Sequence, residues 1–430
     1  MARPLSSNLQ PETAAIPKPA TNKSALTVVT LIFFMWGFLT SLNDVLIPHL
    51  KAVFALNYTE IMLVQFTFFG AYFVMSLPSG KVVSLVGYKR SIVIGLLIAG
   101  VGAALFYPAA ALPSYPLFLG AFFILASGIT LLQVAANPYV SLLGPERTAS
   151  SRLNLAQALN SLGTTLAPKF GGVLILSGTV LGAAELAQLP AVQQAAYRAA
   201  QAQSVQGPYL ILAAVLAALA LMVFLFRLPA PGAEQATDHS RHRFRDALRH
   251  RHLLFGVIGI FVYVGAEVSI GSFMINYLAL PDIGNLAESR AANFVALYWG
   301  GAMIGRFAGA LLLQKVDPRK LLSLFAAIAA LLVLTTMLTT GSVAVWSVVA
   351  IGLFNSIMFP NVFTFGIEKM GALTGTASSL LIMAIVGGAV IPLLQGALAD
   401  TIGVHHAFVL PLLCYLYIVF YGLKGSQIRA

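Results

Sequence analysis

Two long stretches of this sequence contain no acidic or basic side chain, and they constrain the fold more than any other feature. Residues 91–145 and 321–367 contain no Asp, Glu, Lys or Arg. Because a helix of about 20 apolar residues spans a bilayer, each stretch is long enough to cross twice. Pro113 and Pro116 interrupt the first stretch, and Gly341 interrupts the second. The chain is therefore expected to be a polytopic membrane protein.

The composition favours membrane helices. Charged residues make up 9% of the chain, against roughly 25% in soluble domains, and the mean hydropathy is +0.87. The apolar runs are continuous, whereas the strands of membrane barrels alternate apolar and polar residues. We therefore predict an all-α integral membrane protein with twelve transmembrane helices. The predicted spans are 25–50, 60–80, 90–110, 115–141, 152–176, 207–227, 253–280, 290–313, 320–340, 343–366, 375–398 and 404–423.

The basic residues gather on one side of these predicted spans. Lys51, Arg198 and Arg290 fall on the other side and Lys169 within a span, which leaves 21 of the 25 Lys and Arg on the side of the N-terminus. Membrane proteins carry this excess on their cytoplasmic loops. We therefore predict that both termini are cytoplasmic. The net charge of +11 reflects this asymmetry rather than binding to nucleic acid.

The longest charged segment divides the chain into two halves. It covers residues 227–252 and falls between the sixth and seventh predicted spans. We interpret it as a solvated linker. The predicted organisation is a disordered cytoplasmic tail (1–24), an N-terminal six-helix half (25–228), a cytoplasmic linker (229–252) and a C-terminal six-helix half (253–424).

Two carboxylates lie inside apolar runs. Asp44 is late in the first predicted span, and Glu267 is near the middle of the seventh. A carboxylate in hydrocarbon costs several kcal/mol unless a partner, a proton or a cation compensates it, and such residues usually face a transport pathway. We predict that both carboxylates are cation or proton sites that approach a shared central cavity. Glu267 is interpreted as the one ionisable residue near the centre of a span.

Short sequence matches relate the two halves. Pro138 follows Asn137, and Pro360 precedes Asn361. The separation of the two prolines in the sequence is similar to the separation of the two carboxylates. The sequence Thr-Ala-Ser-Ser occurs at 148–151 and again at 376–379, each time at the entry to an odd-numbered span. Repeated halves around a central site are the usual plan of secondary transporters.

Polar side chains occur within several spans at positions where lipid could not satisfy them. In the fifth span Asn154, Gln157, Asn160 with Ser161, and Thr164 recur every three to four residues and so share one helix face. This face is expected to bind a sugar, since amides both donate to and accept from hydroxyls, or else to bond neighbouring helices. The predicted substrate-binding residues are Asn43, Gln133, Asn137, Gln157, Asn160, Asn276, Trp299, Asn355, Asn361 and Gln395.

An enzymatic function is not expected. All seven His fall in loops or at helix ends, and the sequence lacks the Gly-Lys-Ser/Thr loop that cradles the phosphates of ATP. We predict no cofactor other than a co-transported H⁺ or Na⁺, the latter held by Asp44 or Glu267. A channel is an alternative, but it does not need two repeat-related buried carboxylates.

The sequence resembles the fucose/galactose/glucose symporter family of the major facilitator superfamily. The resemblance covers residues 26–423. The motifs that carry it are Leu42-Asn43-Asp44, Ala135-Ala136-Asn137-Pro138, Gly144-Pro145-Glu146, the run Arg152 to Ser161, Tyr263-Val264-Gly265-Ala266 and Gly305-Arg306-Phe307. The loop Gly80 to Arg90 is similar to that between helices two and three in the superfamily, with Ser84 where an Asp is usual.

The resemblance implies cation-coupled uptake of a monosaccharide by alternating access. In the fucose branch an Asp in helix one and a Glu in helix four carry the proton-linked chemistry. Asp44 matches the first, whereas the second position is Gln133. Glu267 stands where that branch has Gln, a pattern that looks more like the glucose/galactose branch. H⁺ and Na⁺ both remain open as the coupling ion.

The sequence therefore predicts a monomeric importer of glucose, galactose or fucose in the bacterial inner membrane, with lipid and sugar as its partners. An importer of N-acetylglucosamine is the alternative substrate reading. A multidrug exporter of the same fold is disfavoured, because it would be expected to have an aromatic, Met-rich cavity with few amides.

Overall fold

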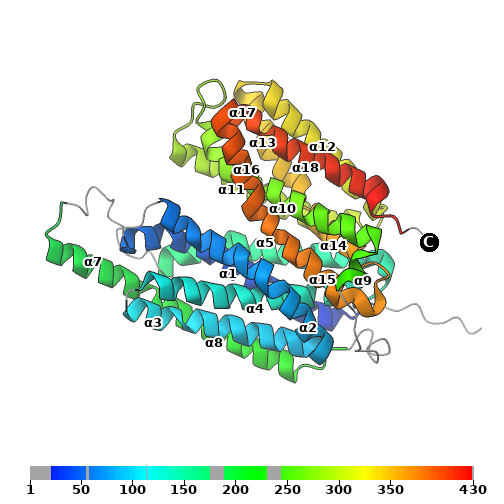
Figure 1. Ribbon diagram of the computed structural model, residues 1–430, viewed down its shortest axis with the longest axis horizontal. Helices are drawn as coiled ribbons and strands as arrows, with labels where there is room; N and C mark the ends of the chain where they lie inside the picture. The colour runs from blue at the N-terminus through cyan, green and yellow to red at the C-terminus, as the bar shows by residue number, and fades with distance from the viewer. Residues whose placement is uncertain (1–20, 55–57, 113, 175–187, 230–243, 429–430) are drawn as a thin grey trace, which may run out of the picture.

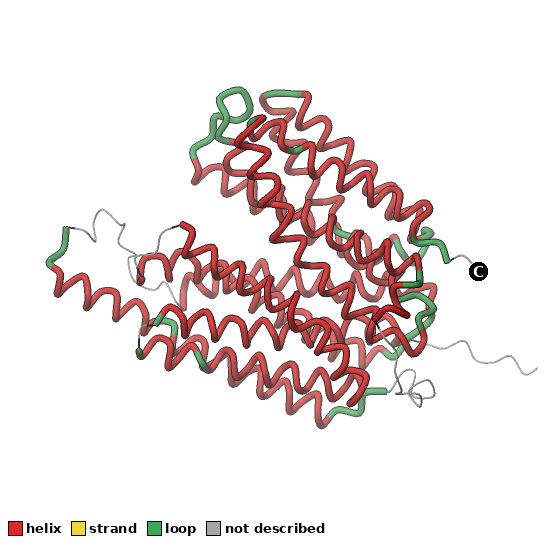
Figure 2. The backbone as a smooth tube through the Cα atoms, viewed as in Figure 1, coloured by secondary structure: helices red, strands yellow, loops and turns green. Residues whose placement is uncertain are grey.

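The computed structural model describes residues 21–54, 58–112, 114–174, 188–229 and 244–428. All regular elements of these residues are helices, and the described chain contains no strand (Figure 2). The side chains of Asn43 and Asp44 and the residues of the predicted tail up to residue 20 lie outside what is described, as does most of the predicted linker, residues 230–243. The predicted division of the chain into a tail, two halves and a linker stays a prediction.

The helices follow the predicted spans closely. Those of the first half are α1 (Lys23–Phe54), α2 (Tyr58–Ala104), α3 (Phe106–Ala111), α4 (Tyr115–Leu142), α5 (Ala149–Leu174), α7 (Ala191–Ser204) and α8 (Gln206–Leu225). After α9 (Phe244–Leu248), those of the second half are α10 (Arg251–Leu278), α11 (Glu288–Leu312), α12 (Pro318–Leu338), α13 (Gly341–Asn355), α14 (Met358–Gly366), α15 (Thr374–Met383), α16 (Gly387–Ile402), α17 (Val404–Ala407) and α18 (Val409–Phe420). Short turns of helix are η1 (Glu146–Thr148), η3 (Gly371–Leu373), η4 (Ala384–Val386) and η5 (Tyr421–Gly425).

The predicted helical membrane fold is confirmed. Ten runs of the described residues are long and apolar enough to cross a membrane. One of them, Leu63–Ala111, contains two spans, because Gly87 breaks the helix with φ of 79°, a conformation that glycine adopts at little cost. With that run counted as two, and with α5, which packs against α1, the described chain has the twelve predicted spans.

Two predicted spans are broken inside the bundle. The span predicted at 343–366 is divided into α13 and α14, and the span at 375–398 is divided into α15 and α16 by the turn η4. The first break has a local cause in Pro360, which has no N–H and whose ring clashes with the carbonyl four residues earlier. That carbonyl belongs to Ser356, which together with Ile357 lies between α13 and α14.

The two halves form lobes that meet at one end and diverge at the other (Figure 1). The contacts between halves join α5 to α11 and α14, and join α2 and α4 to α15. Both ends of the described chain lie at the end where the lobes meet. There the Asn22 amide donates to the Leu143 carbonyl, and Arg319 at the start of α12 donates to Ser426. We call this end the termini-bearing face.

Glycines set the close crossing of α1 and α5 in the first half. A Cβ at Gly163 would overlap the carbonyl oxygen of Phe34, and one at Gly37 would overlap the backbone of Asn160. The two backbones therefore touch, and the Asn160 side-chain amide donates to the Phe33 carbonyl at 3.0 Å. Small residues that let backbones approach are a common device of helix association in membranes.

This crossing predicts a stability difference between two glycines. Gly163→Ala should destabilise the purified protein by about 1–3 kcal/mol, the usual cost of overpacking, and lower its thermal unfolding temperature in detergent. Gly120→Ala on α4 is the control, since a Cβ there meets nothing within 4 Å. Equal unfolding temperatures for the two variants would show that the α1–α5 crossing tolerates a wider spacing.

Candidate functional site

Glu267 is buried inside the second half and faces a basic partner. It lies on α10 with 8% of its surface exposed, and its Oε1 is 3.8 Å from Nη2 of Arg306 on α11. Oε1 has no hydrogen-bond partner within the described residues. The pair is therefore long and incomplete, which leaves the carboxylate oxygen able to accept a proton or to ligate a cation.

Arg306 joins this pair to the opposite half. Its Nη1 donates to the hydroxyl of Ser161 on α5, and its Nε donates to the Ser356 carbonyl at 3.4 Å. The Arg306 carbonyl in turn accepts from the side-chain amide of Asn154 at 2.6 Å. Part of the polar face of α5, Asn154 and Ser161, thus bonds to a helix of the other half rather than facing a cavity.

Two glycines allow α11 to pack closely against α13 and α5. A Cβ at Gly305 would lie 2.5 Å from the Leu353 carbonyl oxygen of α13, and one at Gly309 would lie 2.8 Å from Nδ2 of Asn154. Both contacts are closer than real Cβ atoms allow, so only glycine fits. This packing places Arg306, between the two glycines, at the junction of α10, α13 and α5.

Arg306 is the functional candidate that the sequence analysis missed. The prediction assigned it to the basic side of the membrane and left Glu267 as the lone ionisable residue near the centre of a span. That prediction is wrong, because the Arg306 side chain is only 13% exposed and faces Glu267. A charged residue six positions before a helix end can extend either outward or inward, and the packing of α11 determines the direction.

A cluster of tyrosines fixes the helices around Glu267. Tyr298 donates to the Glu267 carbonyl at 3.1 Å and receives the Asn355 amide at 2.6 Å. Tyr415 donates to the Asn355 side-chain oxygen at 2.7 Å, and Tyr263 donates to its backbone carbonyl at 2.9 Å. Asn355, a predicted sugar ligand, therefore has both amide atoms engaged in this conformation.

Four of the predicted amides of the first half lie on α4 and α5. Gln133 donates to the Tyr72 hydroxyl at 2.7 Å, and Gln157 donates to Oδ1 of Asn137 at 3.4 Å. Gln157 and Asn137 are buried, whereas Asn160 is half-buried beside α1. These four residues, which we call the amide wall, lie on two helices that contact each other.

The remaining predicted site residues are more dispersed. Asn361 on α14 and Gln395 on α16 are fully buried, and neither amide has a partner within the described residues. Asn276 is exposed near the end of α10 that points away from the termini-bearing face. Trp299 on α11 is 42% exposed, with its ring beside Gly271 of α10. Asn43 and Asp44 cannot be placed among these side chains, since theirs lie outside the described residues.

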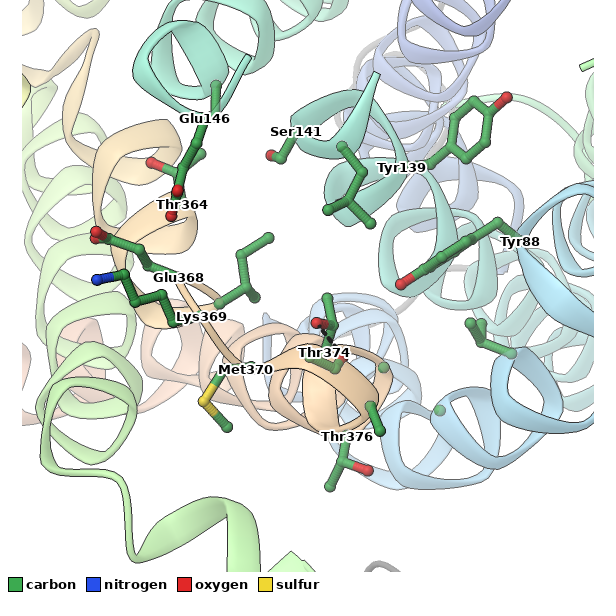
Figure 3. A pocket seen from close by; sticks show the side chains of 18 of the residues that line it. Tyr88, Tyr139, Ser141, Glu146, Thr364, Glu368, Lys369, Met370, Thr374 and Thr376 are labelled. Atoms are coloured by element: carbon green, nitrogen blue, oxygen red, sulfur yellow. Dashed lines mark hydrogen bonds between the residues drawn. The ribbon is translucent and has the colours of Figure 1, made fainter. Parts of the chain in front are cut away.

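A cavity of about 1410 Å³ opens at the termini-bearing face between the two halves. Figure 3 shows Tyr88, Tyr139 and Ser141 of the first half across from Thr364 and Glu368 of the second. Glu368 is bonded to Arg319 at 2.5 Å, so one acid of the lining is already paired. The cavity is separate from Glu267, which does not line it.

No group of three or more His, Cys, Asp or Glu side chains that could hold a metal ion occurs in the described part of the chain. Ser269 on α10 is buried with an unpaired hydroxyl, but it lies two residues from Glu267 and therefore on another side of the helix. A monovalent cation at Glu267 would thus need ligands from neighbouring helices.

The chain belongs to the Major Facilitator Superfamily, since residues 29–391 match the sequence profile of that family. A protein named glucose/galactose transporter from Brucella abortus is 53% identical over 94% of each chain. A putative glucose/galactose transporter from Helicobacter pylori is 45% identical over 95% of this chain and 98% of its own. The crystal structure of FucP in the outward conformation has a TM-score of 0.86 at 34% identity, covering 94% of this chain and 98% of that one.

The buried ion pair predicts non-additive stability effects. Removing one partner of a buried pair leaves an uncompensated charge and typically costs 3–5 kcal/mol. Arg306→Met should therefore lower the unfolding temperature strongly, whereas the double variant Glu267→Gln with Arg306→Met should recover much of that loss. The check is a double-mutant cycle by thermal unfolding in detergent. Additive losses would mean that the two side chains do not interact.

Proposed function

We propose that this protein imports a monosaccharide by alternating access, coupled to the entry of H⁺ or Na⁺. The observation that carries the proposal is the similarity to proteins named glucose/galactose transporter, which extends over nearly the whole of both chains. FucP, with the same arrangement of helices, is the Escherichia coli fucose:proton symporter. Glucose, galactose and fucose are the candidate substrates.

Glu267 is the proposed coupling site, where the ion and the Arg306 guanidinium would compete for the carboxylate. A proton would neutralise the carboxylate, and Na⁺ would use it as an oxygen ligand. Either ion would weaken the hold of Glu267 on Arg306, which is already long at 3.8 Å. Arg306 would then remain bonded to Ser161 of the other half. Asp44, repeat-related to Glu267, is proposed as the second carboxylate of the pathway.

The sugar is proposed to lie against the amide wall of α4 and α5. Gln157 and Asn137 hold each other through a single long bond of 3.4 Å, which a sugar hydroxyl could replace at little cost. Gln133 and Asn160 lie beside them on the same two helices. Trp299, Asn276, Asn43, Asn355, Asn361 and Gln395 are the further candidate ligands, and Asn355 would first have to release a tyrosine.

We propose that the termini-bearing face is cytoplasmic and that the membrane is the bacterial inner membrane. The relatives named glucose/galactose transporter are bacterial, and the basic residues concentrate on this side. The lobes diverge at the opposite end (Figure 1), as expected for a chain that resembles FucP in the outward conformation. A monomer suffices for this mechanism, because each proposed ligand comes from one chain.

The amide wall predicts a loss of sugar affinity. Gln157→Ala should weaken sugar binding by roughly 1–3 kcal/mol, because it leaves a hydroxyl partner unpaired. Asn160→Ala should do the same and should also lower the unfolding temperature, since it removes the bond to Phe33. Calorimetric titration with glucose, galactose, fucose and N-acetylglucosamine measures the affinities, and thermal unfolding in detergent measures the loss of stability in Asn160→Ala. Wild-type affinity in both variants would assign these amides to helix packing alone.

The coupling site predicts a separation of accumulation from exchange. Glu267→Gln keeps the shape of the side chain and abolishes its charge, so gradient-driven sugar accumulation in proteoliposomes should be lost. Counterflow of radiolabelled sugar should partly survive, since exchange does not require release of the ion. Wild-type uptake at fixed pH with and without Na⁺ then assigns the ion. Accumulation by Glu267→Gln at the wild-type level would transfer the coupling role to Asp44.

A further inference from the structure

The repeated Thr-Ala-Ser-Ser motif has no part in the proposed sugar or ion site, yet its serines are among the most buried of the chain. The motif occurs at 148–151, where α5 begins, and at 376–379, within the first turns of α15. Ser150 and Ser151 are at most 5% exposed, and Ser378 and Ser379 are fully buried. The large majority of hydroxyls so far from solvent have partners within the protein.

In the first copy, both serines bond to the second half. The Ser150 hydroxyl is 2.8 Å from the Thr364 hydroxyl of α14. The Ser151 hydroxyl donates to the Ala310 carbonyl of α11 at 2.6 Å. Ala310 lies in the last turn of its helix, where carbonyls have no partner within the helix. This carbonyl is therefore available to a donor from α5.

In the second copy, both serines contact the first half. The Ser378 hydroxyl donates to the Val134 carbonyl of α4 at 2.8 Å. Val134 is four residues before Pro138, which has no N–H to offer it, so this carbonyl is also available. Ser379, whose hydroxyl donates to the Gly375 carbonyl of its own helix at 3.0 Å, lies so close to Gly80 of α2 that a Cβ on Gly80 would overlap its hydroxyl oxygen.

The two sets of contacts are related by the internal repeat. The first serine of each motif contacts the helix that carries a repeated proline. Ser150 on α5 contacts α14, which carries Pro360, and Ser378 on α15 contacts α4, which carries Pro138. The second serine of each motif contacts the second span of the opposite half. Ser151 on α5 contacts α11, and Ser379 on α15 contacts α2. We propose that the two motifs together form a hydroxyl latch that holds the halves closed at the termini-bearing face.

The position of the latch indicates what it closes. Ser150, Thr364 and Thr374 line the cavity at the termini-bearing face, so the Ser150–Thr364 bond lies at its inner wall. Arg306 lies one helical turn further inward than Ala310 along α11. Breaking the latch would therefore extend the cavity toward Arg306 and Glu267. Neutral hydroxyl bonds are individually weak, which suits a closure that must open in every cycle.

The experiment measures the closed population directly, without sugar or ion. Arg147→Cys and Ala372→Cys, on η1 and η3 across the cavity, would carry spin labels in a Cys414→Ala background, because both positions are exposed. Pulsed electron resonance then reports the distance between them. Removing both hydroxyls in Ser150→Ala with Ser378→Ala should raise the ratio of open to closed molecules by about ten-fold or more, from roughly three- to ten-fold per bond.

The matched control is Ser127→Ala on α4. Ser127 is as buried as the latch serines, but its hydroxyl bonds only to Phe123 of its own helix. The control should leave the distance distribution as in the wild type. A double variant that also leaves the distribution unchanged would overturn the latch, whatever the outcome of the sugar and ion experiments.

A second variant opens the latch without removing a bond. Gly80→Ala adds a methyl group against Ser379, and the clash can be relieved by parting the halves. It should shift the distances toward the open form, in the same direction as the serine variants. Gly70→Ala, on the same helix with nothing within 4 Å of its Cβ, should not. Equal distributions for Gly80→Ala and Gly70→Ala would count against the latch even if the serine variants failed to fold.

Discussion

Two prolines inside the bundle each leave a backbone carbonyl without its helical partner, and much of the structure depends on how those carbonyls are satisfied. A free carbonyl cannot be left to lipid. Pro138 frees the Val134 carbonyl, which accepts from Ser378 of the other half. Pro360 frees the Ser356 carbonyl, which accepts from Arg306. The repeated prolines therefore provide one anchor for the contact between halves and another for the guanidinium that faces Glu267.

The Arg306 guanidinium makes other contacts besides its ion pair with Glu267. It bonds Ser161 across the halves and reaches Ser356, while its distance to Glu267 is 3.8 Å. A well-formed buried pair would be shorter and would satisfy the carboxylate fully. Arg306 is thus a counter-charge that lowers the cost of burying Glu267 without saturating it. This intermediate strength suits the coupling role proposed for Glu267, in which an ion binds and leaves in each cycle.

The spans could be predicted from the sequence because membrane insertion depends on local composition. The ends of α4 and α12, and the break before α13 at Gly341, follow from residues within a few positions. The direction of the Arg306 side chain could not be predicted, since it depends on glycines of α11 packing against α13. The partners of Asn154 and Asn355 were likewise hidden, because each bonds a helix distant in sequence. The repeat of Thr-Ala-Ser-Ser was visible, but its contacts were not.

The proposed ion site and the proposed latch share one helix contact. Arg306 on α11 bonds to Ser161 of α5, and one turn later on α11 the Ala310 carbonyl accepts from Ser151, also of α5. A movement of α11 away from α5 would break both bonds together, and it would also change the distance from Arg306 to Glu267. Charge at Glu267 and closure of the termini-bearing face are then not independent. Such a shared element, which two sites both bias, is the physical requirement for coupling ion binding to a change of access.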